Sequence, residues 1–149
     1  MKRISASDHE PISKEFEDLM KEKMSQAPYP AFLGMVLEEV RKDYSRMRLR
    51  YRPELNQPAG VLHGGAVMSL IDTAVVNAIL SGVEQMPDQL LSIDVHTHFL
   101  SMVREEDCIA EAEVRHRGRK IVFLNVEVRT ASGKLVADGA VSYKVAYPR

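Results

Sequence analysis

One acid interrupts an otherwise apolar helical stripe in the middle of the chain, and it is the first candidate for chemistry. Apolar residues recur there at spacings of three and four, the period of a helix with one buried face: Ala66, Val67, Leu70, Ile71, Ala74, Val75, Ala78 and Ile79. Asp72 lies among them. A carboxylate is costly to bury unless it has hydrogen-bonding partners or a chemical role. Asp72 is therefore either a bonded structural acid or a reactive group.

The loop before this stripe contains residues that let a ligand approach the backbone. His63, Gly64 and Gly65 directly precede the apolar run. The first N–H groups of a helix have no partner within the helix, and the helix dipole favours negative charge there. Because glycine has no side chain, Gly64 and Gly65 could stabilise a developing oxyanion at this point. The His63 side chain either takes part in the chemistry or only fixes the loop through a hydrogen bond.

Two other sets of reactive side chains have simpler explanations. Asp94, His96 and His98 alternate on one strand face, as metal ligands can, but no further ligand cluster has a supporting spacing. A solvated or interface-facing strand accounts for them. Cys108 is the only cysteine, which excludes an internal disulfide and fits a reducing compartment, and the three acidic residues before it disfavour a thiolate. We therefore expect neither a metal site nor a cysteine nucleophile.

Hydrophobic periodicity and turn residues predict the elements that must position these groups. A short helix should run from Pro11 to about Gln26 and end at the prolines that follow it. The long helix follows the glycine loop and ends at Gly82. Alternating apolar residues predict strands over the remaining segments, at residues 32–40, 44–52, 90–100, 108–116, 119–130 and 135–146.

These elements predict an α+β domain in which an antiparallel sheet of five to six strands curls around one long central helix. Residues 1–30 would form an N-terminal extension with a short helix, whose first ten residues are loose, and residues 31–149 the main domain. A single helix covers the sheet, so exposed sheet edges remain. We expect an edge to pair with a second copy of the chain.

Length and charge exclude several classes of protein. The 149 residues suffice for one domain with a proper core. The chain has 20 basic and 21 acidic residues and a net charge of -1, so no overall field favours nucleic acid or a membrane surface. No apolar run approaches the length of a membrane span, and no apolar signal segment follows the first residues. We expect a cytoplasmic protein.

The spacing of the candidate residues resembles that of a known family. Gln57 is followed six positions later by His63-Gly64-Gly65, Asp72 lies nine positions after His63, and Ser92-Ile93-Asp94-Val95 follows on a strand. With these residues the chain resembles hotdog-fold acyl-CoA thioesterases, and more narrowly the phenylacetate-pathway and 4-hydroxybenzoyl-CoA thioesterase branch. The resemblance covers about residues 30–146. It implies a hotdog fold and a dimer with active sites at the subunit interface, and such dimers commonly pair into tetramers.

The resemblance also implies a role for each residue. The Gly64 N–H would polarise the thioester carbonyl, and Gln57, or its neighbour Asn56, would orient it. Asp72 lies two and a half helical turns from His63, too far to reach a carbonyl held by its own loop. It would therefore face the loop of the other subunit and act as general base or as nucleophile. Ser92 would position water or the carboxylate.

A basic hairpin tip is the candidate site for the phosphates of coenzyme A. Such a run of charge is commonly only a solvated turn, but the resemblance implies phosphate contacts from basic residues near this turn. The residues concerned are Arg117, Gly118, Arg119 and Lys120. Gly65 would also contact the substrate. Because the coenzyme A thioester is itself the substrate, we expect no separate cofactor.

Two other functions compete with thioester hydrolysis. Some hotdog domains are non-catalytic acyl-CoA sensors in transcription regulators, but the roughly 30 residues before the first strand are too few for a helix-turn-helix domain. Hotdog dehydratases use a histidine and an acid in a different motif, which this chain lacks.

Overall fold

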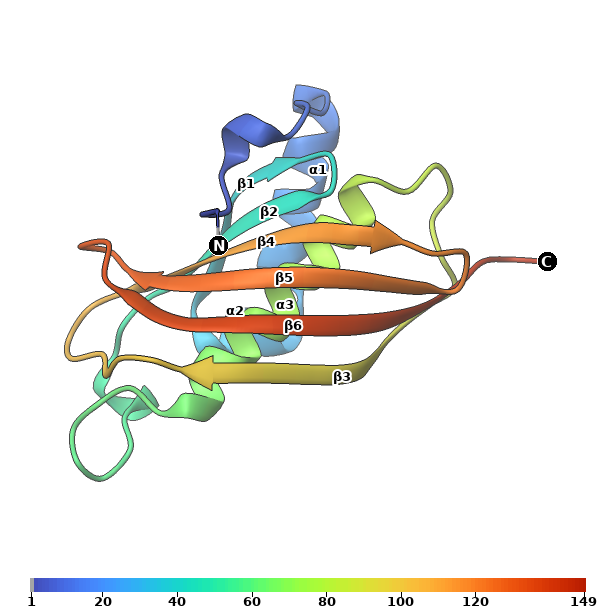
Figure 1. Ribbon diagram of the computed structural model, residues 1–149. Coiled ribbons are helices and arrows are strands. Elements are labelled where there is room, and N and C mark those ends of the chain that lie inside the picture. Colours follow the sequence, from blue (N-terminus) through green and yellow to red (C-terminus); the bar gives the residue numbers. More distant parts are fainter. Residues whose placement is uncertain (1) are drawn as a thin grey trace.

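A six-stranded antiparallel sheet in the order β1-β2-β4-β5-β6-β3 wraps around one long helix in the computed structural model, which describes residues 2–149 (Figure 1). The strands are β1 (Met35–Arg41), β2 (Tyr44–Leu49), β3 (Gln89–Phe99), β4 (Cys108–Arg117), β5 (Ile121–Thr130) and β6 (Leu135–Ala146). The helices are α1 (Lys14–Gln26), α2 (Pro28–Leu33) and α3 (Gly64–Ser81), with short 3-10 turns at Ala6–Asp8 and Pro53–Leu55. The predicted α+β hotdog architecture is confirmed.

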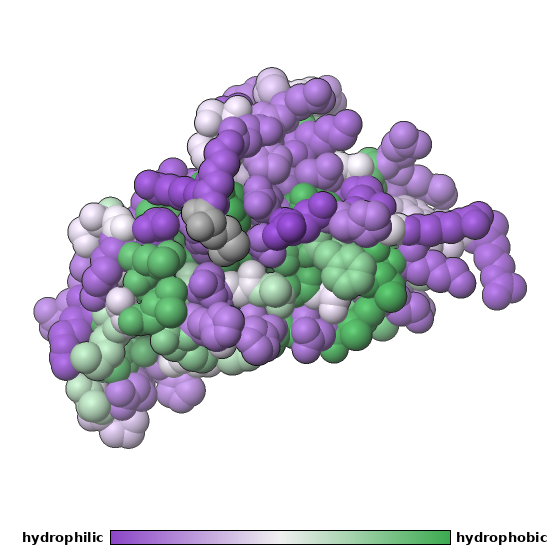
Figure 2. All heavy atoms as spheres, viewed as in Figure 1, coloured by the Kyte–Doolittle hydropathy of each residue, from purple (hydrophilic) through white to green (hydrophobic). Residues whose placement is uncertain are grey.

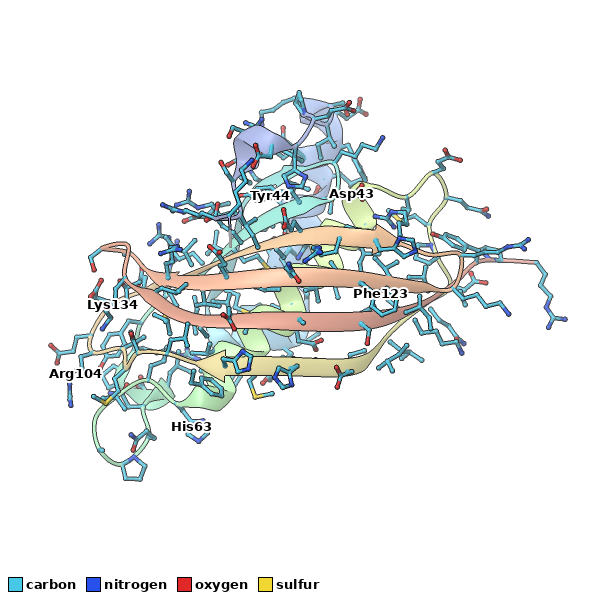
Figure 3. All side chains as sticks on the ribbon, viewed as in Figure 1. Asp43, Tyr44, His63, Arg104, Phe123 and Lys134 are labelled. Carbon is cyan, nitrogen blue, oxygen red and sulfur yellow. The ribbon has the colours of Figure 1, made fainter. Side chains whose placement is uncertain are left out.

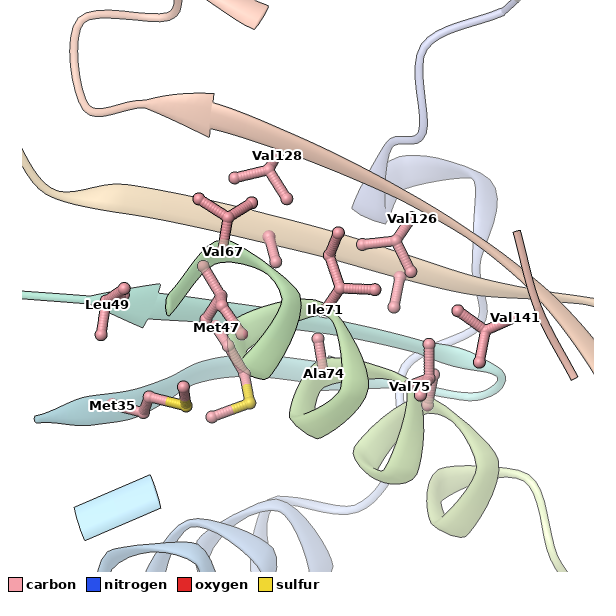
Figure 4. Packing of buried hydrophobic residues seen from close by; sticks show 14 of the residues in the cluster. Met35, Met47, Leu49, Val67, Ile71, Ala74, Val75, Val126, Val128 and Val141 are labelled. Carbon is pink, nitrogen blue, oxygen red and sulfur yellow. The ribbon is translucent and has the colours of Figure 1, made fainter. Parts of the chain in front are cut away.

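The core lies between α3 and the concave face of the sheet. Leu70, Ile71 and Val75 of α3 are fully buried, and Figure 4 shows Ile71 and Val75 in one cluster with Val126 and Val128 of β5. The opposite, convex face mixes polar and apolar side chains (Figure 2). Contrary to the expectation that no apolar run reaches membrane-span length, α3 is long and apolar enough to do so, and 56% of it is buried inside this domain. Its apolar character is explained by its central position.

The N-terminal segment differs from its prediction. Residues expected to be loose lie against the sheet: Ile4 is buried, and a bridge between Pro11 and Arg41 extends the β1 edge. Pro11 is therefore outside α1, whose N-cap is Ser13. The His9 ring stacks on Tyr44, with centroids 5.1 Å apart, and Tyr44 is fully buried. The extension thus covers convex-face side chains that would otherwise be exposed.

The prolines after α1 begin a second helix instead of only ending the first. Pro28 lies in the first turn of α2, where its missing N–H is not needed and its fixed φ is favourable. Gly34, with φ of 77°, ends α2 in a left-handed conformation. Consequently Phe32 belongs to α2, and the first strand starts at Met35 instead of at residue 32.

The C-terminal end of α3 is held by an ion pair that leaves no room for a side chain at Gly82. Arg117 Nη2 lies 2.5 Å from Asp43 Oδ1 and donates to the Ile79 carbonyl at 3.0 Å. A Cβ atom on Gly82 would lie 2.0 Å from Asp43 Oδ1 and 2.7 Å from Arg117 Nη2. Asp43 thus lies at the end of α3 opposite to His63 (Figure 3).

We predict that Gly82→Ala lowers the free energy of unfolding by about 1–3 kcal/mol, because the added methyl displaces the Asp43 carboxylate from Arg117. Urea unfolding monitored by circular dichroism measures the loss. In the double variant Asp43→Gly/Gly82→Ala the closest clash, with Asp43, is absent and Arg117 is free to move away, so the destabilisation should be smaller than the sum of the two single changes. Additive losses would contradict this steric explanation.

Candidate active site

Asp72 is a partly buried acid with a hydrogen-bond donor from the sheet. The Tyr143 hydroxyl, on β6, donates to Asp72 Oδ1 at 2.9 Å. Tyr143 is 5% exposed, and burial, followed by the negative charge of Asp72, raises the pKa of its phenol. The phenol therefore stays protonated and remains a donor. No partner of Asp72 Oδ2 occurs within residues 2–149, which leaves that oxygen available for chemistry.

Sequence inspection missed Tyr143, although a signal was present. Tyr143 alternates with Val141 and Val145, which are both buried on the concave face of β6. A hydroxyl in such a position needs a partner when it is buried. Asp72 is the only acid in α3, so it was the partner to expect for the Tyr143 hydroxyl.

A β-bulge brings Ser92 to the same place as Asp72. Ser92 pairs with Tyr143, and the register of β3 against β6 shifts between Ser92 and Asp94. Because the bulge inserts one residue, Ser92 and Val95 both line the pocket that contains Asp72. This pocket is about 330 Å³ and also contains Tyr29. Ser92 and Asp72 are therefore brought together as predicted, whereas Asp94 pairs with Ser142 on the other face.

At the start of α3, His63 acts as a helix cap. Its Nδ1 accepts a hydrogen bond from the Gly65 N–H at 2.8 Å. The Gly65 N–H is thus occupied within the protomer, and a structural role of His63 is apparent in this geometry. The Gly64 N–H has no acceptor among residues 2–149. Gly64 is therefore the free donor at this helix end.

The two adjacent amides of the preceding loop have different surroundings. Asn56 donates to the Tyr51 hydroxyl at 3.0 Å, and its own Oδ1 is buried. Gln57 Oε1 accepts from the Ala59 N–H at 2.7 Å, and the residue lines a pocket of about 310 Å³ together with Gly64. Of the two amides, the one that shares a pocket with the Gly64 donor is Gln57.

The two halves of the predicted site are separate within one protomer. Gln57 and Gly64 line one pocket, with the exposed Phe99 and Met102, and Asp72 lines another. Eight residues separate Gly64 from Asp72 along α3, which corresponds to about 12 Å of helix. A thioester carbonyl bound at Gly64 is therefore out of reach of the Asp72 of the same chain.

Two residues of the basic hairpin tip make internal contacts, and two are exposed to solvent. Arg117 is engaged by Asp43 and by the end of α3, and the Gly118 N–H donates to the Ile121 carbonyl at 2.9 Å. A Cβ atom on Gly118 would lie 2.5 Å from that carbonyl oxygen, so glycine is needed for the turn. Arg119 and Lys120 are exposed. They are the cations of this tip that can meet a phosphate without breaking an internal contact.

The remaining reactive side chains lie away from these pockets. Cys108 is fully buried in the core, and burial, with the nearby acids, raises its pKa to about 12. On the convex face, His96 lies 3.2 Å from His98, which bonds Asp138 at 2.8 Å. Within residues 2–149 no group of three or more histidine, cysteine or acidic side chains could hold a metal ion.

Comparisons with known proteins identify the family of the chain. The family model described as thioesterase superfamily matches residues 59–137, which include Gly64, Asp72 and Ser92. Human acyl-coenzyme A thioesterase 13 is 29% identical over 93 residues, covering 61% of this chain and 65% of that protein.

Two solved structures share the fold. A thioesterase from Haemophilus influenzae superposes with a TM-score of 0.81 at 22% identity, covering 93% of this chain and 94% of that one. The PaaI protein from the phenylacetic acid degradation operon of E. coli superposes with a TM-score of 0.78 at 18% identity, covering 89% and 96%. The family model covers more than half of the chain, and the fold is that of these neighbours. The chain therefore belongs to the thioesterase superfamily.

Proposed function

We propose that this protein hydrolyses acyl-CoA thioesters to a free acid and coenzyme A, with each active site formed by two subunits. The observation that carries the proposal is the half-buried Asp72, which accepts a hydrogen bond from Tyr143 through one oxygen and lines a pocket. The match to the thioesterase superfamily and the similarity to a relative named acyl-coenzyme A thioesterase support acyl-CoA thioesters as the substrate class. The spacing of Gln57, His63 and Asp72 supports the phenylacetate-pathway and 4-hydroxybenzoyl-CoA branch.

The reaction needs a base or nucleophile and an oxyanion donor. Asp72 removes a proton from water as the water oxygen attacks the thioester carbonyl, or its carboxylate attacks directly and water then cleaves the mixed anhydride. The Gly64 N–H of the partner subunit stabilises the oxyanion, and the partner's Gln57 orients the carbonyl. In the first route the coenzyme A sulfur takes up that proton from Asp72 as the C–S bond breaks; in the second it leaves as a thiolate, and a proton is released from the water that later cleaves the anhydride. Tyr143 holds the carboxylate and Ser92 lies beside it.

A shared site requires a dimer, and the exposed edge strand β3 supports one. β3 is an edge of the sheet, and the apolar Leu91 and Ile93 on it are 54% and 56% exposed. The other edge, β1, is partly covered by the extension through Pro11. An open edge strand with exposed apolar side chains favours pairing with another chain. Arg119 and Lys120 are then the proposed contacts to the coenzyme A phosphates, and two dimers could form a tetramer.

Thiol release from a panel of acyl-CoA substrates tests the proposed activity. The expected result is steady release of coenzyme A from at least one substrate by the purified protein. Binding of acyl-CoA without any release would instead indicate the non-catalytic sensor.

We predict that Asp72→Asn lowers kcat by about 10²–10⁴, because the amide keeps the shape and the Tyr143 hydrogen bond but cannot accept a proton or attack. The matched control is Asp138→Asn, the same change on the convex face, which should keep kcat within about twofold of the wild type. Unfolding midpoints of both variants verify the fold. Full activity of Asp72→Asn would remove Asp72 from the mechanism.

We predict that Gly64→Pro lowers kcat by about 10²–10³, since it removes the N–H that is the proposed oxyanion donor. Proline is well accepted at the first position of a helix, and His63 has the extended conformation that proline requires before it. Gly64→Ala is the control, because it adds a Cβ atom near Phe99, at 3.3 Å, but keeps the N–H. Equal losses in the two variants would mean that sterics, and not the donor, matter.

We predict that mixing the inactive Asp72→Asn and Gly64→Pro proteins restores activity. If each site combines Asp72 of one subunit with Gly64 of the other, a mixed dimer has one intact site. Random exchange of subunits then yields about a quarter of the wild-type activity. The measurement is thiol release after denaturation and joint refolding, compared with each variant refolded alone. No recovery in mixed dimers that have been isolated by two affinity tags would exclude shared sites.

A further inference from the structure

An apolar groove lies between α1 and α3, apart from both pockets described above. Its volume is about 130 Å³, and its lining is almost entirely apolar. The residues contributed by α1 include Phe16, Leu19 and Met20, and Leu80 of α3 and Met86 of the following loop face them. Leu19 and Met86 are 44% and 53% exposed, so the groove opens to the surface of the protein.

The groove lies further toward the C-terminal end of α3 than the reaction pocket, and the two share no lining residue. The pocket contains Asp72 and Thr73, and the groove begins at Asn77, one turn further on. Leu80 is eight residues beyond Asp72, so the groove reaches about 12 Å past the carboxylate along the helix. The Asn77 amide donates to the Thr73 carbonyl at 3.1 Å and to Met47 Sδ at 3.4 Å. Its protons are thus occupied, and it does not interrupt the apolar lining with a free donor.

The apolar lining of the groove and its distance from Asp72 indicate which part of a substrate it binds. A thioester whose carbonyl is attacked by Asp72 must extend its acyl group into a neighbouring space, and an apolar groove about 12 Å further along α3 is within reach of a medium or long alkyl chain but not of a benzoyl group. Methionine side chains such as Met20 and Met86 adapt to chains of different length.

We propose that this groove binds the distal part of a medium- or long-chain aliphatic acyl group and sets the chain-length preference, with Leu19 as a specificity-determining residue. The assignment rests on the proposed hydrolysis at Asp72. Each methylene buried in the groove strengthens binding about fourfold. Acyl groups that end before Asn77 gain nothing from it, and neither does a short aromatic acyl group.

The variant Leu19→Trp tests the assignment, because indole fills the groove from an exposed position of α1. With dodecanoyl-CoA, kcat/KM should fall about tenfold or more, while the value for acetyl-CoA stays within about twofold. The control is Glu22→Trp, which adds the same side chain to an exposed position of α1 outside the groove. It should change neither value. If Leu19→Trp does not fold, Met86→Trp fills the groove from the opposite wall with the same expected result.

An equal loss for both substrates, or an unchanged value for dodecanoyl-CoA, would overturn the assignment. Calorimetric binding of a dodecyl-CoA thioether, which cannot be hydrolysed, separates this proposal from the proposed function. If the wild type hydrolyses no thioester but binds the thioether about tenfold more tightly than coenzyme A, and Leu19→Trp abolishes that difference, the groove assignment stands alone. If the wild type hydrolyses thioesters but both ligands bind equally to the two proteins, the groove assignment fails alone.

Discussion

Burial of α3 by a single curled sheet is the constraint on which the rest of the structure depends. The helix has apolar residues on most of its circumference, and one sheet supplies the concave face that removes them from water. A buried polar group of that helix then needs a partner, either on the helix itself or on the sheet. Asp72 finds Tyr143, and Ser45 of β2 donates to the Ala74 carbonyl at 2.6 Å. The candidate catalytic acid is thus held by the same packing that makes the core.

The same constraint separates the two halves of the site. A helix of 18 residues places its free N-terminal donors far from an acid in its middle. One helix also cannot cover both edges of a six-stranded sheet, and β3 stays open with Leu91 and Ile93 exposed. The proposed second subunit would answer both, because it would cover the open edge and bring its own Gly64 to Asp72. The proposed dimer is therefore a consequence of how the core is built.

Much of the fold could be predicted because it depends on local patterns. The period of the α3 residues and the alternation along β5 and β6 have direct counterparts in the structure, and β6 begins and ends at the predicted residues. The errors fell where local rules compete. Pro28 both ends α1 and begins α2, and the polar residues before Pro11 are ordered by contacts with β1, more than 25 residues away in the sequence.

The sequence by itself determined the fold class and the identity of the candidate acid and donor, because hydrophobic period and residue spacing are local properties. Only the tertiary structure decided their partners. In the folded chain the Tyr143 hydroxyl donates to Asp72, and Ser92, beside a β-bulge, lines the same pocket as Asp72. The fold also engages Arg117 with Asp43, leaving Arg119 and Lys120 free. Partners such as Asp72 and Tyr143 are 71 residues apart, and only the register of strands against a buried helix brings them within hydrogen-bonding distance.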